Sequence, residues 1–185
     1  MGLLEYLRWC EELQMEPVLG VFAGYALLGE RLSSPEDLAP FVQESLEEIE
    51  YIVGDASTPW GARRAQDGHP APFKLRYVEI GNEDEFDRSR SYDRRFSVFY
   101  KAIKARYPQL QIVSTMPVAA TPSQRPDLVD EHTYALGEAQ MYEHLHDYDA
   151  RPRSEPKVMI SVRHGLAADV QLAPGCSFRR SLGFL

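Results

Sequence analysis

The sequence predicts an α/β fold in which helices cover a parallel sheet. Helical and strand patterns alternate along the 185 residues, and the predicted strands are continuous apolar runs. Such runs are typical of strands buried on both faces, as in parallel sheets. Two architectures stay open: a doubly wound sheet needs only about five strands, whereas a closed eight-stranded barrel takes about 250 residues and would require an incomplete chain.

The chain begins with a helix, a strand and a second helix. Leucines and a cysteine at helical spacing predict the first helix over residues 3–13, with one apolar stripe. A short apolar, β-branched run predicts a buried strand over residues 16–22. Ser34 and Pro35 then mark a second helix, because a serine cap followed by proline is a common start signal. That helix keeps one apolar face until Gly54.

Residues 54–73 show no periodicity and are predicted to form a long loop. Connections of this length in compact domains are usually functional or disordered, and the aromatic residues here argue against plain disorder. Arg63 and Arg64 in this segment are expected to face solvent. Trp60 is expected either to stack on a sugar ring or to anchor the loop on the core.

Strands and helices continue to alternate up to Ser161. From Val162 to residue 185 both periodicities are lost, so this tail is predicted to be irregular and not a continuation of the same domain. The later predicted strands cover residues 74–83, 110–116, 127–134 and 156–161, and the later helices residues 91–107 and 138–148.

Charge and composition exclude several classes of protein. Twenty basic and 28 acidic side chains give a net charge of -8, which disfavours nucleic acid as a partner. No apolar run reaches the roughly 18 residues of a membrane span, so no membrane association is expected. Phosphate-binding loops, nucleotide fingerprints and cysteine-rich metal clusters are missing from the sequence, and no cofactor is predicted.

A Gly-Asn-Glu tripeptide ends the predicted strand at residues 74–83. In parallel α/β proteins ligands lie at the carboxyl ends of strands, and Glu83 is at such an end. A carboxylic acid there can donate a proton to a leaving group if its surroundings raise its pKa. The Asn82 amide suits a sugar hydroxyl. A simpler interpretation is that both residues cap the next helix or face water.

His132 and Tyr134 lie near the end of the strand predicted over residues 127–134. If this strand is parallel to the one before Glu83, their side chains reach the same face as Glu83, since a spacing of two places both on one side. The alternative is a core histidine and tyrosine that satisfy backbone groups. The histidines of "HLHD" at residues 144–147 point about 200° apart on a helix, so no metal site is predicted.

Several long segments together resemble one known family. The sequences "QMEPVLGVFAGY", "GDASTPWGARRAQDGHPAPFKLRYVEIGNE", "YDRRFSVFYKAIKARYPQLQIVST", "PDLVDEHTY" and "EPKVMIS" occur in the order and spacing of the catalytic domain of α-L-arabinofuranosidases. These are enzymes of glycoside hydrolase family 51, and the sequence resembles the eukaryotic type especially. The resemblance covers about residues 1–161.

The resemblance implies a partial (β/α)8 barrel, a TIM barrel with about strands three to seven, truncated at both ends. Residues 1–161 would form this catalytic domain and residues 162–185 an irregular tail, which a shifted reading frame would explain. The implied activity is retaining hydrolysis of terminal non-reducing α-L-arabinofuranosyl residues of arabinan or arabinoxylan, in L-arabinose metabolism. The implied partner is an arabinofuranosyl-containing polysaccharide or oligosaccharide, and the full-length family member is expected to be secreted.

The resemblance also implies roles for four residues. Glu83 matches the general acid/base, Asn82 the residue that holds the 2-hydroxyl, and His132 and Tyr134 the family's H-x-Y motif. The nucleophilic glutamate, expected near Val162, is absent, and no glutamate follows Glu155. This chain is therefore predicted to be inactive. The alternative is a non-catalytic carbohydrate-binding or decoy protein.

Overall fold

The computed structural model describes residues 1–165 apart from 28, 30 and 136. The chain forms two compact units. The first comprises Met1–His132 and Arg153–Ser161, and the second comprises Thr133–Pro152 and, among the described residues, 162–165.

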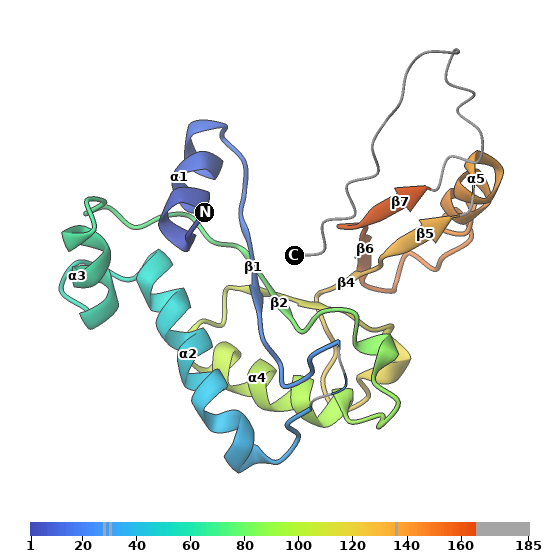
Figure 1. Ribbon diagram of the computed structural model, residues 1–185, viewed down its shortest axis with the longest axis horizontal. Coiled ribbons are helices and arrows are strands. Elements are labelled where there is room, and N and C mark those ends of the chain that lie inside the picture. The colour runs from blue at the N-terminus through green and yellow to red at the C-terminus, as the bar shows by residue number, and fades with distance from the viewer. Residues whose placement is uncertain (28, 30, 136, 166–185) are drawn as a thin grey trace, which may run out of the picture. The chain divides into compact units, whose positions relative to one another are not determined.

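A parallel five-stranded sheet organises the first unit, with strand order β1-β2-β3-β4-β6. Figure 1 shows β1, β2 and β4 of this sheet. Short apolar segments form all five strands, which confirms the parallel α/β class predicted from the sequence. The strands are β1 (Val18–Val21), β2 (Tyr77–Ile80), β3 (Gln111–Ser114), β4 (Leu128–Asp130) and β6 (Lys157–Met159).

The spatial order of these strands follows their order along the chain. A doubly wound sheet reverses its strand order at a switch point, where its ligand binds. Among the described strands of this sheet no such reversal occurs. The order is therefore unlike that of the doubly wound alternative.

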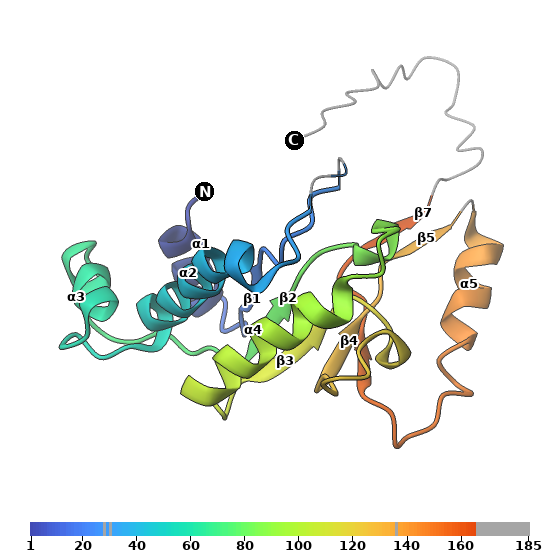
Figure 2. The ribbon, with the colours of Figure 1, turned by 90° about the horizontal axis from the view of Figure 1, so that it is seen from below.

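Amphipathic helices pack on the sheet around an apolar core, to which Leu38, Ile80 and Phe96 belong. Helices α2 and α4 lie side by side in both views (Figures 1 and 2). The serine cap predicted for α2 is present, because the Ser34 side chain accepts a hydrogen bond from the Asp37 amide. The helical segments of the first unit are α1 (Leu3–Glu12), α2 (Pro35–Val53), α3 (Pro59–Gln66), α4 (Tyr92–Arg106) and two short 3-10 turns, η1 (Asp84–Phe86) and η2 (Val118–Ala120).

The segment predicted to be a long loop contains a helix, α3. It begins with the signal that marks α2, since Thr58 accepts a hydrogen bond from the Gly61 amide and Pro59 occupies the first helical position. The loop prediction was wrong because α3 is only eight residues long, too short to show a helical period.

Arg64 is buried, although the sequence analysis placed it in solvent. Its guanidinium donates hydrogen bonds to four backbone carbonyls, and none of its surface is exposed. The acceptors are Tyr51, Ile52, His69 and Pro70, which connect the end of α2 with the segment after α3. Arg63 keeps 62% of its side chain exposed, as expected.

The second unit contains a helix and a two-stranded parallel sheet. Its helix matches the one predicted over residues 138–148. The predicted irregular tail begins with a strand instead, β7, and residues 166–185 lie outside the described residues. The elements of this unit are β5 (Thr133–Ala135), α5 (Glu138–His146) and β7 (Arg163–Gly165).

The strand predicted over residues 127–134 is two strands. Glu131 and His132 separate β4 from β5, and the two strands join different sheets. His132 lies outside a strand, so a spacing of two does not place its side chain on the same side as that of Tyr134.

None of the described helices is both long enough and apolar enough to cross a lipid bilayer.

Candidate active site

The carboxyl ends of β2 and β4 place polar residues at one edge of the first unit's sheet. Strand β2 ends at Ile80 and is followed by the Gly-Asn-Glu turn, while β4 ends at Asp130, two residues before His132. Because all strands of this sheet are parallel, their carboxyl ends share one edge. Glu83 and His132 can therefore meet although β3 lies between their strands.

Glu83 and His132 contact each other directly. The Nδ1 atom of His132 lies 2.9 Å from Oε1 of Glu83, and the two side chains are 7% and 14% exposed, respectively. Burial acts to lower the pKa of His132, but the hydrogen bond to Glu83 and the charges of Asp130, Glu83 and Glu79 outweigh burial and raise it. The imidazole is thus disposed to carry a proton that faces the Glu83 carboxylate.

The opposite side of His132 is fixed by Asp130 and Ser161. Asp130 is buried and accepts hydrogen bonds from both the backbone amide and the hydroxyl of Ser161. The Ser161 hydroxyl also lies 3.2 Å from Nε2 of His132. Both ring nitrogens therefore have polar partners, which restricts the orientation of the ring.

Glu79 completes the polar cluster on the strand side. Burial first, and then the charge of Asp130 and a hydrogen bond with it, raise the pKa of Glu79 to about 7. Glu79, Asp130 and His132 each offer a ligand atom within 4.8 Å of the others, a spacing that a metal ion can use. Asp130 already bonds Ser161, and His132 already bonds Glu83. These contacts favour a hydrogen-bonded cluster of side chains over a metal site.

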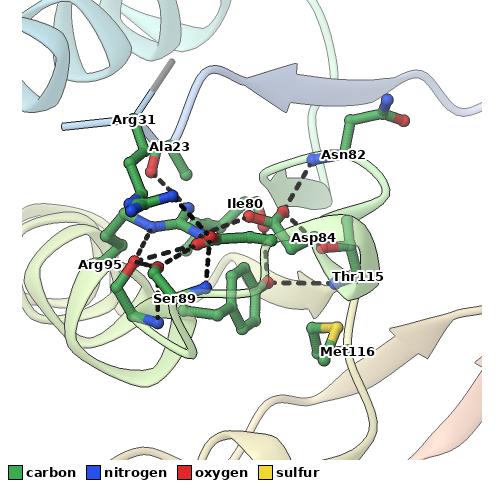
Figure 3. Close-up of polar contacts among 12 residues, drawn as sticks. Ala23, Arg31, Ile80, Asn82, Asp84, Ser89, Arg95, Thr115 and Met116 are labelled. Atoms are coloured by element: carbon green, nitrogen blue, oxygen red, sulfur yellow. Dashed lines mark hydrogen bonds and ion pairs between the residues drawn. The ribbon is translucent and has the colours of Figure 1, made fainter. Parts of the chain in front are cut away.

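The other residues singled out from the sequence lie in different surroundings. Asn82 is exposed, and its side chain points away from Asp84 while its backbone nitrogen faces that carboxylate (Figure 3). Tyr134 lies in β5 of the second unit and is 50% exposed. Trp60 is in α3, where it lines a groove with Leu3 and Tyr51.

A buried network beneath the Gly-Asn-Glu turn was missed by the sequence analysis. Arg95 of α4 lies between Asp84 and Asp87 and has no exposed surface (Figure 3). The Tyr92 hydroxyl donates to the Ile80 carbonyl at 2.6 Å and accepts from the Thr115 amide at 3.1 Å. A signal was present in the sequence, since an arginine interrupts the apolar face of α4 shortly after an acidic run.

The fold and this edge define an α/β protein with a carboxylate–imidazole site at the carboxyl ends of parallel strands. The family described as the Alpha-L-arabinofuranosidase 1 domain matches residues 1–153. A probable alpha-L-arabinofuranosidase A from Aspergillus flavus is 42% identical over 162 residues, covering 84% of this chain and 26% of that protein. Alpha-L-arabinofuranosidase 2 from Arabidopsis thaliana is 37% identical over 163 residues, covering 87% of this chain and 23% of that protein.

Solved structures agree with these sequence matches. An arabinose-bound MgGH51 α-L-arabinofuranosidase superimposes with a TM-score of 0.78 at 38% identity, covering 85% of this chain and 25% of that one. A family 51 enzyme from Bifidobacterium longum, 20% identical with a TM-score of 0.61, shares the fold over 81% of this chain and 34% of its own. The chain therefore belongs to the α-L-arabinofuranosidase family, glycoside hydrolase family 51. It spans about a quarter of the length of the curated relatives it matches.

Proposed function

We propose that residues 1–161 form part of a (β/α)8 catalytic domain that hydrolyses terminal α-L-arabinofuranosyl groups. The contact between Glu83 and His132 at the carboxyl edge of the sheet is the observation that carries this proposal. The strand order, which follows the chain without reversal, supports an arc of a barrel. The arabinose-bound relative, 38% identical, supports an arabinose-containing glycan such as arabinan or arabinoxylan as the substrate.

In this proposal Glu83 is the general acid/base. As the family's nucleophilic carboxylate bonds to the anomeric carbon and the glycosidic C–O bond breaks, the leaving oxygen takes a proton from the Glu83 carboxyl group. In the second step Glu83 accepts a proton from the water that attacks the glycosyl-enzyme. Because His132 can carry a proton at Nδ1, 2.9 Å from Glu83, it can stabilise the ionised form of Glu83 between the steps.

Asn82, His132 and Tyr134 bind the arabinofuranosyl ring in this proposal. Asn82 has an exposed amide next to Glu83 along the chain and is suited to a sugar hydroxyl. The hydroxyl group of Tyr134 can bind in the same way.

A retaining glycosidase needs a second carboxyl group about 5 to 5.5 Å from the first, which acts as the nucleophile. The family's nucleophilic glutamate is expected near Val162, and the sequence holds no glutamate after Glu155. We therefore propose that this chain alone turns over little or no arabinofuranoside, because the covalent intermediate cannot form.

The test places residues 1–161 in the corresponding segment of the Aspergillus flavus relative, which retains its own remaining sequence. Release of 4-nitrophenol from 4-nitrophenyl α-L-arabinofuranoside is expected from this chimera. The Glu83→Gln change in the chimera should lower turnover by roughly 10²- to 10⁴-fold. An active chimera that is unaffected by this change would refute the role of Glu83, and activity of the 185-residue chain alone would refute its proposed inactivity.

The missing nucleophile favours a second candidate, a carbohydrate-binding or decoy protein without chemistry. Titration calorimetry of the 185-residue chain with arabino-oligosaccharides tests whether the chain binds such sugars, while the chimera assay shows whether residues 1–161 also support catalysis. Binding at micromolar affinity, weakened by Asn82→Ala and unaccompanied by hydrolysis, would support this function. Binding heat identical to that of a buffer titration would exclude it.

A further inference from the structure

The turn that carries Glu83 has an unfavourable backbone conformation. Gly81 has φ of 96° and Glu83 has φ of 51°, both in the left-handed region. That region is easy for glycine, but for a residue with a side chain it costs on the order of 1 to 2 kcal/mol. Side-chain contacts must therefore stabilise this conformation.

Asp84 provides those contacts from beneath the turn. Its Oδ2 atom accepts hydrogen bonds from the Asn82 amide at 3.0 Å and from the Thr115 hydroxyl at 2.9 Å. A Cβ atom added to Gly81 would lie 2.1 Å from the same oxygen, so the carboxylate lies directly against the glycine. One buried oxygen thus links the turn after β2 to the residue that follows β3.

Arg95 holds Asp84 in this position. Nη2 of Arg95 lies 2.8 Å from Oδ1 of Asp84, and neither side chain has exposed surface. Nη2 also donates a hydrogen bond to Oδ2 of Asp87 at 2.9 Å, so one guanidinium pairs with both carboxylates. Nη1 of Arg95 donates to the Ala23 carbonyl just after β1 (Figure 3), which anchors the network on a third strand end.

We propose that Asp84 is the positioning residue for the acid/base turn: by holding the Asn82 amide and the Thr115 hydroxyl, it keeps Glu83 against His132. This role affects catalysis only through the proposed function of Glu83, on which it rests. The contact between Glu83 and His132 is present in the structure whatever that function is. Asp87, which shares the Arg95 guanidinium, bonds Ser89 and Ser91, and no described hydrogen bond joins its side chain to Asn82.

The test measures the pKa of His132 by NMR titration of its ring protons in the intact 185-residue chain. Glu83→Gln removes the carboxylate that contacts His132, so the pKa of His132 should be lower by roughly 0.5 to 1 pH unit. This variant is the reference for a complete loss of the contact. Asp84→Asn should lower the His132 pKa toward that reference. Asp87→Asn is the matched control, because Asp87 is an equally buried partner of Arg95, and it should leave the His132 pKa as in the wild type.

Amide hydrogen exchange gives a second measurement on the same samples. The Asn82 amide should exchange at least about tenfold faster in Asp84→Asn than in the wild type, because its acceptor is weakened. Asp87→Asn should not change its exchange relative to neighbouring amides. A wild-type His132 pKa together with wild-type Asn82 exchange in a folded Asp84→Asn chain would overturn the proposal.

Thr115→Val covers the case in which Asp84→Asn does not fold. It removes one hydroxyl donor to Asp84 and keeps the shape of the side chain, so a smaller change of His132 pKa in the same direction is expected. No change in this variant would overturn the proposal. None of these measurements requires turnover, so a failure of the proposed enzymatic function would appear only in the chimera assay.

Discussion

Glu83 and His132 are 49 positions apart in the sequence, yet Oε1 of one lies 2.9 Å from Nδ1 of the other. The contact exists because β2 and β4 are parallel members of one sheet and each residue follows the carboxyl end of its strand. A side chain that bonds a carboxylate at one ring nitrogen and a serine hydroxyl near the other has little rotational freedom. The sheet edge therefore holds an oriented acid–imidazole pair.

Glu79 should make the stability of the protein depend on pH. Its pKa is 4.5 in the reference state and about 7 in the folded state. Because this pKa is raised, the stabilisation is complete below about pH 4.5 and is lost as the pH rises to about 7. Glu79 is partly accessible, so we expect the loss to be on the order of 1 to 3 kcal/mol.

Urea unfolding at several pH values between 4.5 and 8 measures this effect. In Glu79→Gln the fall in unfolding free energy across this range should be smaller than in the wild type. The pKa of His132 is also raised, so His132 contributes in the same direction, but mainly above 6.5, the ordinary pKa of a histidine. If the unfolding free energies of the wild type and of Glu79→Gln changed equally with pH below pH 6.5, the assignment of this effect to Glu79 would be contradicted.

Gly81→Ala should destabilise the first unit strongly. The new Cβ atom would lie 2.1 Å from Asp84 Oδ2 and would displace this buried carboxylate. The backbone of an alanine would also be strained at a φ of 96°. We expect a loss of roughly 2 to 4 kcal/mol in unfolding free energy. Gly20→Ala in β1 is the matched control, because no atom lies within 4 Å of its added Cβ.

Gly20→Ala should be neutral or stabilising by up to about 1 kcal/mol, since alanine loses less backbone entropy than glycine in a strand. Equal destabilisation by both substitutions, measured by urea unfolding, would show that the turn at Gly81 is not constrained as described.

Much of the fold could be predicted from the sequence because its signals are local. Apolar runs and the cap at Ser34 mark their elements within a few residues. Parallel strands also predicted that Glu83 and His132 share one edge of the sheet, but the spacing of two that grouped Tyr134 with His132 was wrong, because Tyr134 lies in β5 of another sheet. The roles of Asp84 and Arg95 depend on pairing across distant segments, which periodicity does not encode. Helix α3 was missed because eight residues show too little period.

Ser34→Ala should cost about 1 kcal/mol, because the Asp37 amide loses its acceptor at the start of α2. Ser34→Gly should cost only a few tenths of a kcal/mol, since glycine leaves the helix terminus accessible to water. Thermal unfolding of both variants checks this order. A larger loss for glycine than for alanine would contradict a capping role.

Arg64 and Arg63 are neighbours in sequence with opposite surroundings, so they make a matched pair. Arg64 is fully buried and donates to four carbonyls, two at the end of α2 and two in the segment after α3. Arg63 instead forms an exposed ion pair with Asp67. Arg64→Met keeps most of the volume but leaves buried carbonyls without donors, which should cost roughly 2 to 5 kcal/mol. Arg63→Met should cost less than about 0.5 kcal/mol.

Arg64→Lys should also be strongly destabilising, because one ammonium group cannot reach the acceptors that the planar guanidinium reaches from several nitrogens. Urea unfolding gives the free energies, and hydrogen exchange of α3 amides shows where stability is lost. Faster exchange should begin in α3 and the end of α2, where the acceptor Tyr51 lies. A lysine variant as stable as the wild type would mean that charge alone, and not the fork of donors, joins these two helices.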